Sequence, residues 1–208
     1  MMRVAVLVSG GGSNLQAILD AKARGELPQA DLCLVLSSSA DAYALERAAK
    51  ANVPGEVCSP QDFADRSAYT DALLAILEQY RVEAVVLAGF MFMLSPQFAE
   101  KYENRALNVH PALIPSFCGP GYYGLKVHQY ALDAGVKVSG ATVHFVTAET
   151  DAGPIIAQKA VDILEDDTPE VLQRRIMEQC EWILLPRALG LLTEGKITVE
   201  NGRVHIDN

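Results

Sequence analysis

The sequence predicts an α/β fold in which a mostly parallel sheet carries helices on both faces. Short runs of apolar and β-branched residues alternate with longer amphipathic segments through the first half of the chain. Strands that read as continuous apolar runs are typical of parallel sheets, because both faces of such a sheet are covered. Right-handed crossovers between these strands then give a doubly wound, Rossmann-like arrangement.

In the first half, each of the first three expected strands is followed by an expected helix. The strands are expected over residues 3–9, 31–37, 57–58 and 84–88. The helices are expected over residues 15–22, 42–51 and 67–80. In the last of these, Tyr69, Leu73 and Leu77 recur at helical spacing, which gives the segment one apolar face.

The second half begins differently. A strand is expected over residues 106–110, and it leads into a loop over residues 111–124 that is rich in proline, glycine and aromatic residues. Two further strands, over residues 140–146 and 155–163, are joined by only a short link. Because a parallel pair needs a long crossover, we expect these two strands to be antiparallel.

A long helix and a hairpin are expected at the C-terminal end. Thr168 can cap the helix, with Pro169 at its first position. The helix should run towards Leu192 with a kink at Pro186, because proline lacks the N–H that the helix needs. Within residues 197–206, the dipeptide Asn201-Gly202 predicts a two-residue hairpin turn.

Composition indicates a folded globular protein and disfavours several classes of partner. Of the 208 residues, 50% are hydrophobic and 21% are charged, which is close to average globular usage. The net charge is −9 and no run of Lys and Arg occurs, so nucleic acid is not expected as a partner. The four cysteines form no C-x-x-C pair, and no apolar run is long enough to span a bilayer. We therefore expect a cytoplasmic protein with no membrane partner.

A glycine-rich turn joins the first expected strand to the first expected helix, with the sequence Ser9-Gly10-Gly11-Gly12-Ser13-Asn14. Glycines let the backbone approach an anion closely, and a helix N-terminus offers free N–H groups. A P-loop would need a lysine here, and a dinucleotide fingerprint would need a third glycine where Leu15 stands. The turn favours a lone phosphate over NAD, and a tight turn without a ligand is the alternative.

Two polar side chains lie at the end of the strand over residues 106–110. Asn108 and His110 are two residues apart, so they point to the same face, and Pro111 ends the strand directly after them. An amide and an imidazole placed together can donate to an oxyanion. The alternative is a strand-end histidine whose hydrogen bonds are satisfied within the protein.

Asp151 lies in the turn before Gly153-Pro154. An aspartate there could orient a histidine or hold it in the charged form, although aspartate is also a common turn former. No metal is expected, because the four histidines form no H-x-H or i, i+4 pair.

Taken in order along the chain, these motifs resemble those of the glycinamide ribonucleotide formyltransferases of purine biosynthesis. Residues 9–17 resemble the phosphate loop of that family, and residues 88–96 resemble the segment between its two substrate sites. Asn108-Val109-His110-Pro111-Ala112-Leu113-Ile114-Pro115 resembles the catalytic signature. Residues 140–146 and 151–156 resemble the closing catalytic segment, so the resemblance extends over essentially the whole chain.

The resemblance implies that the amine of glycinamide ribonucleotide attacks the formyl carbon of 10-formyltetrahydrofolate, and that Asn108, His110 and Asp151 carry this transfer. Asn108 and protonated His110 would stabilise the tetrahedral oxyanion. His110 would also move the proton from the incoming amine towards the departing folate nitrogen. Asp151 would keep the imidazolium populated near neutral pH. Formyl folate is the implied co-substrate, with no metal.

The resemblance also assigns binding positions. For the nucleotide they are Gly12, Ser13, Asn14 and Glu181. For the folate they are Arg66, Met91, Phe92, Met93, Leu94, Asn108, Val146, Thr147, Ala148, Glu149, Thr150 and Asp151. The sequence departs from the best-known bacterial members in two places, because Phe92 stands where they have arginine and the loop Ser116–Gly124 is longer than theirs.

We therefore expect a single formyltransferase domain over residues 1–208. Residues 1–104 would form its phosphate-binding half, and residues 105–208 its catalytic and folate-binding half. The partners expected are the two small-molecule substrates, and the protein would act as a monomer or a homodimer.

Four alternatives are weaker. Methionyl-tRNA formyltransferase carries a further C-terminal domain, and formyltetrahydrofolate hydrolase carries an extra N-terminal domain. Here the first strand starts at Arg3 and the chain ends at Asn208, which favours a free small-molecule acceptor. A non-catalytic nucleotide-binding module would need only the glycine loop, and a nicotinamide oxidoreductase is disfavoured by Leu15.

Overall fold

Seven strands form one sheet in the order β3-β2-β1-β4-β5-β6-β7 in the computed structural model, which describes residues 1–207. The strands are β1 (Met2–Val8), β2 (Ala30–Ser37), β3 (Gly55–Val57), β4 (Ala84–Leu87), β5 (Ala106–His110), β6 (Val138–Phe145) and β7 (Ile155–Asp162). β1 to β5 are parallel, whereas β6 is antiparallel to both of its neighbours. The mostly parallel α/β sheet predicted from the sequence is confirmed.

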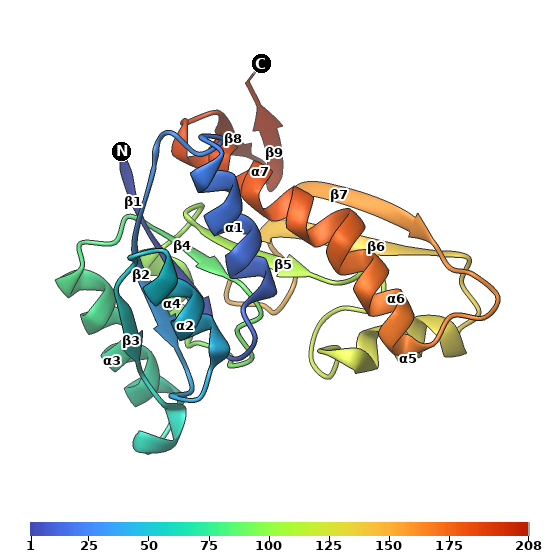
Figure 1. Ribbon diagram of the computed structural model, residues 1–208, viewed down its shortest axis with the longest axis horizontal. Coiled ribbons are helices and arrows are strands. Elements are labelled where there is room, and N and C mark those ends of the chain that lie inside the picture. The colour runs from blue at the N-terminus through green and yellow to red at the C-terminus, as the bar shows by residue number, and fades with distance from the viewer. Residues whose placement is uncertain (208) are drawn as a thin grey trace.

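Helices connect the strands and follow them (Figure 1). They are α1 (Ser13–Ala23), α2 (Tyr43–Lys50), α3 (Arg66–Gln79), α4 (Pro96–Lys101), α5 (Leu125–Asp133), α6 (Pro169–Ile176) and α7 (Trp182–Thr193), with a 3₁₀ turn over Pro60–Asp62. The expected helices are present, with ends that differ by one or two residues. The short helices α4 and α5 were not expected, because neither has a long apolar repeat.

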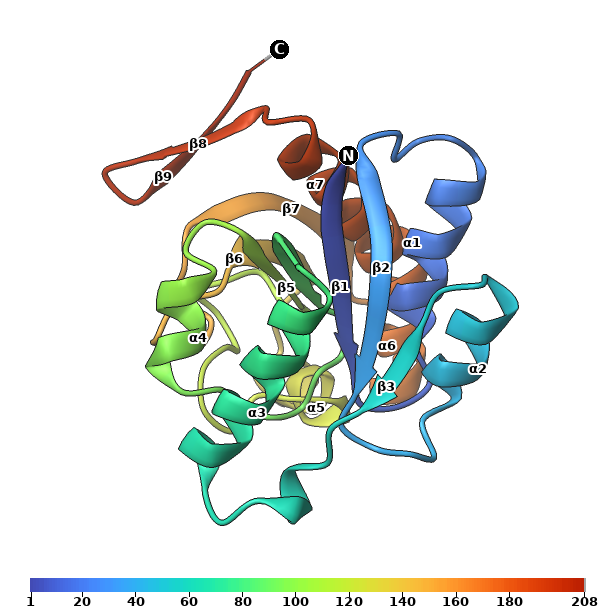
Figure 2. The same ribbon diagram turned by 90° about the vertical axis from the view of Figure 1, so that its left-hand side faces the viewer.

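Two apolar cores lie on opposite faces of the sheet, and alternate residues of each strand feed them. In β1, Val4 and Val6 pack with α1 and α7, whereas Ala5 and Leu7 pack with α3 and α4. Figure 2 shows α3 and α4 on one side of the sheet and α1, α2 and α7 on the other. This alternation is the two-residue period that strands impose.

The C-terminal helical segment differs from the single kinked helix that was expected. A π-helical turn over Met177–Glu181 separates α6 from α7, and Pro186 lies inside α7. Proline has no N–H to donate to the carbonyl four residues earlier. That carbonyl belongs to Trp182, the residue directly after the π-helical turn. The irregular part of the helical segment therefore precedes Pro186. Its last residue, Glu181, lines the cleft described below.

The hairpin of β8 (Ile197–Glu200) and β9 (Arg203–Ile206) is present as predicted. Its two turn residues both have positive φ, 51° at Asn201 and 73° at Gly202. Such a pair is what a type I′ turn requires, and Asn-Gly adopts it with the least strain.

The sheet has a switch point between β1 and β4. From β1 the chain crosses to β2 on one side, and β4 occupies the other side. Ligands in such sheets bind in the crevice at the carboxyl ends of the strands where the order reverses. Among residues 1–207, no helix is both long and apolar enough to cross a bilayer.

Candidate active site

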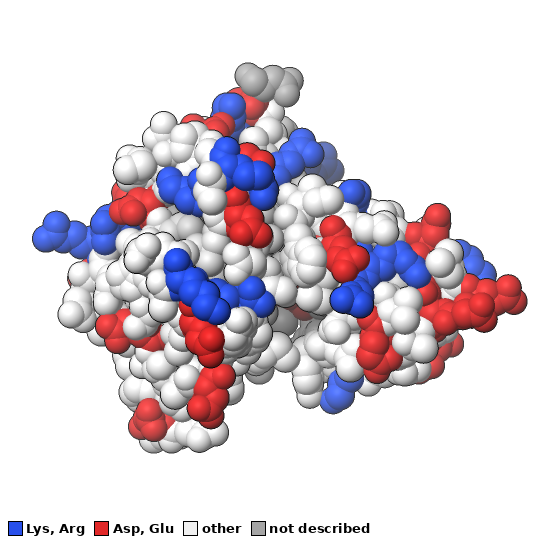
Figure 3. All heavy atoms as spheres, in the orientation of Figure 1, with Lys and Arg blue, Asp and Glu red and all other residues white. Residues whose placement is uncertain are grey.

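A cleft of about 380 Å³ opens at this switch point. Its lining residues are Ser9, Gly10, Gly11, Gly12, Ser13, Asn14, Ala88, Gly89, Met91, Pro111, Gly124, His128, Gln173, Met177 and Glu181. The space-filling view in Figure 3 shows a recess between the half that contains α1 to α3 and the half that contains α5 and α6. On the same face, acidic side chains gather over the turn between β7 and α6, away from this recess.

The glycine loop forms one wall of the cleft. Its Gly10 and Gly11 carbonyls accept hydrogen bonds from residues of α2. The Ala44 N–H donates to the Gly10 carbonyl at 3.1 Å, and Arg47 Nε donates to the Gly11 carbonyl at 2.8 Å. The first N–H groups of α1 have no partner within the helix, so they are available to an anion in the cleft. This arrangement fits the lone phosphate that the sequence favoured.

Gly12 is required for the loop to pack against α2. Its φ is +70°, and a Cβ placed on it would lie 2.6 Å from the Cβ of Ala44. Both the backbone conformation and the contact with Ala44 exclude a larger residue at this position.

Asn14, at the end of the glycine loop, meets Glu181, which lies 167 positions later in the sequence. Asn14 Nδ2 donates to Glu181 Oε2 at 2.7 Å, and both side chains are buried. Burial raises the pKa of Glu181, although the bond from Asn14 acts in the opposite direction. Asn14 Oδ1 is buried and has no hydrogen-bond partner in the described part of the chain.

The other predicted polar residues gather on one face of β5 and β6. In the antiparallel register, Asn108 lies opposite His144 and His110 lies opposite Thr142. The intervening residues Leu107 and Val109 point into the core on the other face. Loops cover the polar face, and Thr142 Oγ1 ties one of them down by donating to the Ala112 carbonyl at 2.7 Å.

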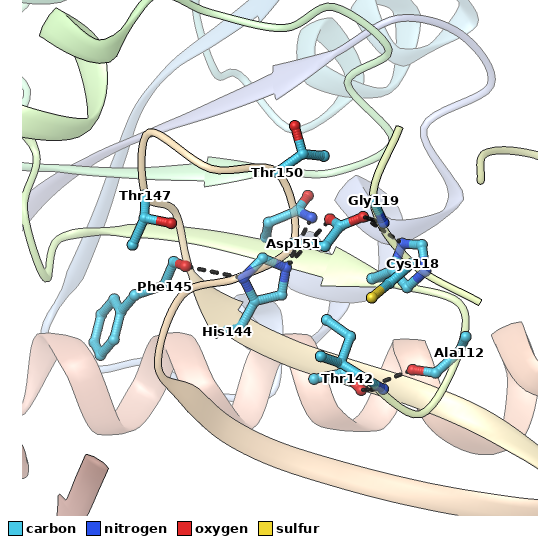
Figure 4. A network of polar contacts seen from close by, with 12 residues as sticks. Ala112, Cys118, Gly119, Thr142, His144, Phe145, Thr147, Thr150 and Asp151 are labelled. Carbon is cyan, nitrogen blue, oxygen red and sulfur yellow. Dashed lines mark hydrogen bonds and ion pairs between the residues drawn. The ribbon is translucent and has the colours of Figure 1, made fainter. Parts of the chain in front are cut away.

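Asp151 lies between the two imidazoles of this face. Its Oδ2 lies 3.6 Å from His110 Nδ1, and its Oδ1 lies 3.6 Å from His144 Nε2. The Gly119 N–H donates to Oδ2 at 2.9 Å. Figure 4 shows the Asp151 carboxylate reaching towards His144 on one side and the Gly119 backbone on the other. The structure thus brings together Asn108, His110 and Asp151, as the sequence predicted.

Asp151 is ionised at neutral pH. Burial raises the pKa of its carboxyl, but the close polar contact with His144, the charge of His110 and the Gly119 N–H together outweigh burial. The net result is a pKa below the usual value of 3.8. A buried negative charge is therefore present beside both histidines.

Backbone geometry holds Asp151 in place. Its φ is +55°, a left-handed conformation that aspartate tolerates better than most residues. Gly153 follows two residues later, and a Cβ on it would lie 1.8 Å from the Phe145 carbonyl oxygen. The turn therefore lies directly against the end of β6, which carries His144.

The hydrogen bonds show where two of the imidazole protons lie. His110 Nε2 lies 2.8 Å from the Phe117 carbonyl, and His144 Nδ1 lies 2.9 Å from the Phe145 carbonyl, so each of these nitrogens carries a hydrogen. His144 Nε2 also lies 3.2 Å from Asn108 Nδ2. It accepts from this amide when the ring is neutral and faces Asp151 as a donor when the ring is charged.

The residues expected to contact folate lie around two loops that touch one another. Thr150 Oγ1 donates to the sulfur of Met93 at 3.7 Å. The Phe92 ring lies against Tyr69 and Phe90, with centroids 6.2 and 6.1 Å apart. Phe92 and Met93 are 41% and 58% exposed, which leaves an apolar surface available to a ligand.

The remaining predicted folate positions differ in exposure. Leu94 and Val146 are partly buried and pack against the core beneath α3. Thr147 donates to the Glu149 carbonyl at 2.9 Å, which shapes the loop that precedes Asp151. Ala148 and Arg66 are exposed, the latter at the start of α3.

Sequence reasoning assigned no role to His144 or His128. His144 could be found only through its partner across the antiparallel pair, which the linear sequence does not show. His128 lines the cleft from the first turn of α5, a helix that was not expected. Within the described part of the chain, no group of three His, Cys, Asp or Glu side chains could hold a metal ion.

Comparison with known proteins gives a consistent result. Residues 2–189 match the family described as formyl transferase. The chain is 38% identical over 207 residues to a phosphoribosylglycinamide formyltransferase of Haemophilus influenzae, covering 100% of this chain and 94% of that protein. A crystal structure of glycinamide ribonucleotide transformylase 1 from Symbiobacterium toebii has a TM-score of 0.93 and 45% identity, and the match covers 100% of this chain and 95% of that one.

Larger and more distant relatives also match. The chain is 42% identical over 203 residues to a trifunctional purine biosynthetic protein, adenosine-3, of Bos taurus. This match covers 97% of the chain but only 19% of the longer protein. A formyltetrahydrofolate deformylase from Pseudomonas syringae has a TM-score of 0.88 with 27% identity, and the match covers 100% of this chain and 66% of that one.

The close contact between Gly12 and Ala44 predicts how a methyl group added at Gly12 changes the stability of the protein. Gly12→Ala should lower the free energy of unfolding by about 1–3 kcal/mol more than Gly25→Ala, because overpacking adds to the cost of a positive φ. Gly25 has a φ of +78° with open space around it, so it measures the backbone cost alone. Urea unfolding of both variants makes the comparison, and equal losses of stability would show that the contact is relieved without cost.

Proposed function

The chain belongs to the formyl transferase family, and on this premise we propose that it transfers the formyl group of 10-formyltetrahydrofolate to the amine of glycinamide ribonucleotide. The products would be formylglycinamide ribonucleotide and tetrahydrofolate, formed in purine biosynthesis. The observation that carries the proposal is the convergence of Asn108, His110 and Asp151 where β5 ends. Pro111, the next residue, lines the cleft that begins at the glycine loop.

In the proposed reaction, the amine nitrogen attacks the formyl carbon and a new C–N bond forms. The carbonyl oxygen then gains negative charge, and the Asn108 amide and the protonated His110 ring are suited to donate to it. The bond between the formyl carbon and the folate nitrogen breaks next. The proton lost by the amine passes to that nitrogen, directly or through water, with His110 as the relay.

Asp151 supports this chemistry without touching the formyl group. Its buried negative charge favours the imidazolium form of His110, and its contact with Nδ1 orients the ring. The Nε2 hydrogen of His110 then faces away from Asp151, towards the Phe117 carbonyl. A substrate oxygen would replace this carbonyl as the acceptor.

The two substrates would occupy different parts of the site. Gly12, Ser13, Asn14 and Glu181 would hold the nucleotide, with its phosphate at the N-terminus of α1. The folate would contact the exposed surface of Phe92 and Met93 and the loop over residues 146–151. Residues 1–104 and 105–208 would thus act as the phosphate-binding and catalytic halves of one domain.

Three further points belong to the same proposal. Formyl folate is the co-substrate and no metal takes part. The enzyme acts in the cytoplasm on small molecules. It acts as a monomer or a homodimer.

Hydrolysis of formyl folate is the second candidate, because the fold is shared with a deformylase. Water would then replace the amine as the attacking group at the same polar residues. A module that binds the nucleotide without catalysis is a third candidate, and it would use the glycine loop alone.

A two-substrate assay tests the proposal. The purified protein should convert glycinamide ribonucleotide and 10-formyltetrahydrofolate to the formylated nucleotide and tetrahydrofolate, with no folate consumed when the nucleotide is omitted. Equal consumption of folate without the nucleotide would identify a hydrolase. Nucleotide binding with no turnover would identify a non-catalytic module.

His110→Ala should lower kcat by about 10²–10⁴-fold, because both a donor to the oxyanion and a proton relay are lost. The Kd for glycinamide ribonucleotide should stay within a few-fold of the wild-type value. His205→Ala, on the exposed strand β9, is the matched control and should leave both constants unchanged. Near-normal turnover of His110→Ala would remove this histidine from the mechanism.

Asp151→Asn should move the pH–rate profile to lower pH. Because the pKa of Asp151 lies below 3.8, its carboxylate is charged throughout the neutral range and favours imidazolium there. Asparagine removes that charge, so imidazolium persists only at lower pH and the corresponding limb of the profile follows. A profile of kcat against pH from 5 to 9 makes the measurement, and an unchanged limb would contradict this role.

A further inference from the structure

One buried histidine of the cleft has no role in the chemistry described above. His128 lies in the first turn of α5 and is 1% exposed. It lines the cleft together with Pro111, Gly124 and Glu181. Its side chain therefore reaches the nucleotide side of the site from the half of the molecule opposite the glycine loop.

Neither ring nitrogen of His128 has a hydrogen-bond partner among residues 1–207. Nearly all buried polar atoms in folded proteins form hydrogen bonds. Two buried nitrogens without a partner therefore indicate that a ligand or a water molecule binds there. A second buried atom without a partner, Asn14 Oδ1, belongs to the same cleft. Three of the five buried side-chain atoms that lack a partner among the described residues therefore belong to this cleft, whereas Tyr69 Oη and Trp182 Nε1 do not.

His128 is uncharged at neutral pH. Burial lowers the pKa of its ring to about 4, and the positive charge of His110 acts in the same direction. A neutral imidazole has one N–H donor and one lone-pair acceptor. Because the two nitrogens point in different directions, a single group can bond only one of them, either by accepting from the N–H or by donating to the lone pair.

A hydroxyl group both accepts and donates, whereas a phosphate at neutral pH only accepts. The phosphate also has its own donors at the start of α1, where backbone N–H groups face the cleft. An acceptor that extends from this loop to His110 would place its sugar between the two. His128, Asn14 and Glu181 line the same cleft as this loop and Pro111, the residue that follows His110.

We propose that His128 is a specificity-determining residue that forms a hydrogen bond, through one ring nitrogen, with a hydroxyl of the sugar in the acceptor substrate. This inference rests on the proposed function for the identity of the acceptor. It adds a discriminating contact from α5 to those expected from Asn14 and Glu181. A site built to bond a hydroxyl rejects an analogue that lacks it, because buried polar atoms are then left unpaired.

Binding measured by calorimetry in the absence of folate tests this contact apart from catalysis. His128→Leu should weaken the binding of glycinamide ribonucleotide about tenfold, which corresponds to the loss of one buried hydrogen-bonding partner. An analogue that lacks both ribose hydroxyls should bind the wild type about tenfold less tightly than the natural nucleotide. The same analogue should bind His128→Leu and the wild type equally well.

Two controls separate the contact from a structural role. His128→Gln keeps a donor and an acceptor and should recover part of the lost affinity, whereas His205→Leu on exposed β9 should change nothing. The ¹⁵N shifts of the His128 ring in the wild type at pH 7 should move when the natural nucleotide is added. They should move much less when the dideoxy analogue is added.

The inference is overturned if His128→Leu discriminates between the two nucleotides as well as the wild type does. It is also overturned if the ring nitrogens do not respond to the natural nucleotide, since a buried water would then be their partner. These outcomes are distinct from a failure of the proposed function. A protein that binds the nucleotide through His128 but transfers no formyl group would refute the activity and retain the contact.

Discussion

The buried carboxylate of Asp151 is the interaction on which the site depends. Its two oxygens face His110 and His144 at 3.6 Å, and the Gly119 N–H stabilises one of them. A carboxylate in this position would be costly to bury without these neighbouring polar groups. Three separate segments, β5, β6 and the turn after β6, are therefore arranged around one negative charge.

The sheet makes this arrangement possible by treating its two faces differently. Over β1 and β4, helices cover both faces, and the side chains of Val4–Val8 and Ala84–Leu87 pack into the two apolar cores. Over β5 and β6, one face meets the helical core while loops cover the other, so polar residues can remain there. The switch point adds a cleft at the same edge, which brings the phosphate-binding loop and the polar face into one continuous site.

Much of this could be predicted from the sequence, for reasons that are local. Short continuous apolar runs predicted the strands, and apolar residues at helical spacing predicted the long helices. Asn201-Gly202 predicted its turn because few other pairs accept two positive φ values. The short helices α4 and α5 escaped prediction, because packing rather than periodicity stabilises them. A kink was expected at Pro186, but the irregular turn lies at Met177–Glu181. The sequence shows which residue lacks an N–H, but it does not show which turn of the helix changes its hydrogen bonding as a result.

The sequence by itself determined the alternating α/β pattern, the glycine loop and the placement of Asn108 and His110 on one side of a strand. Those features follow from spacing along the chain, whereas Asp151 joined the same group only through the resemblance to a known family. Only the tertiary structure decided that His144 lies opposite Asn108 and that the nitrogens of His128 meet no partner. Strand register and burial arise from contacts between distant segments, and no local pattern of residues encodes which of those contacts remain unmet.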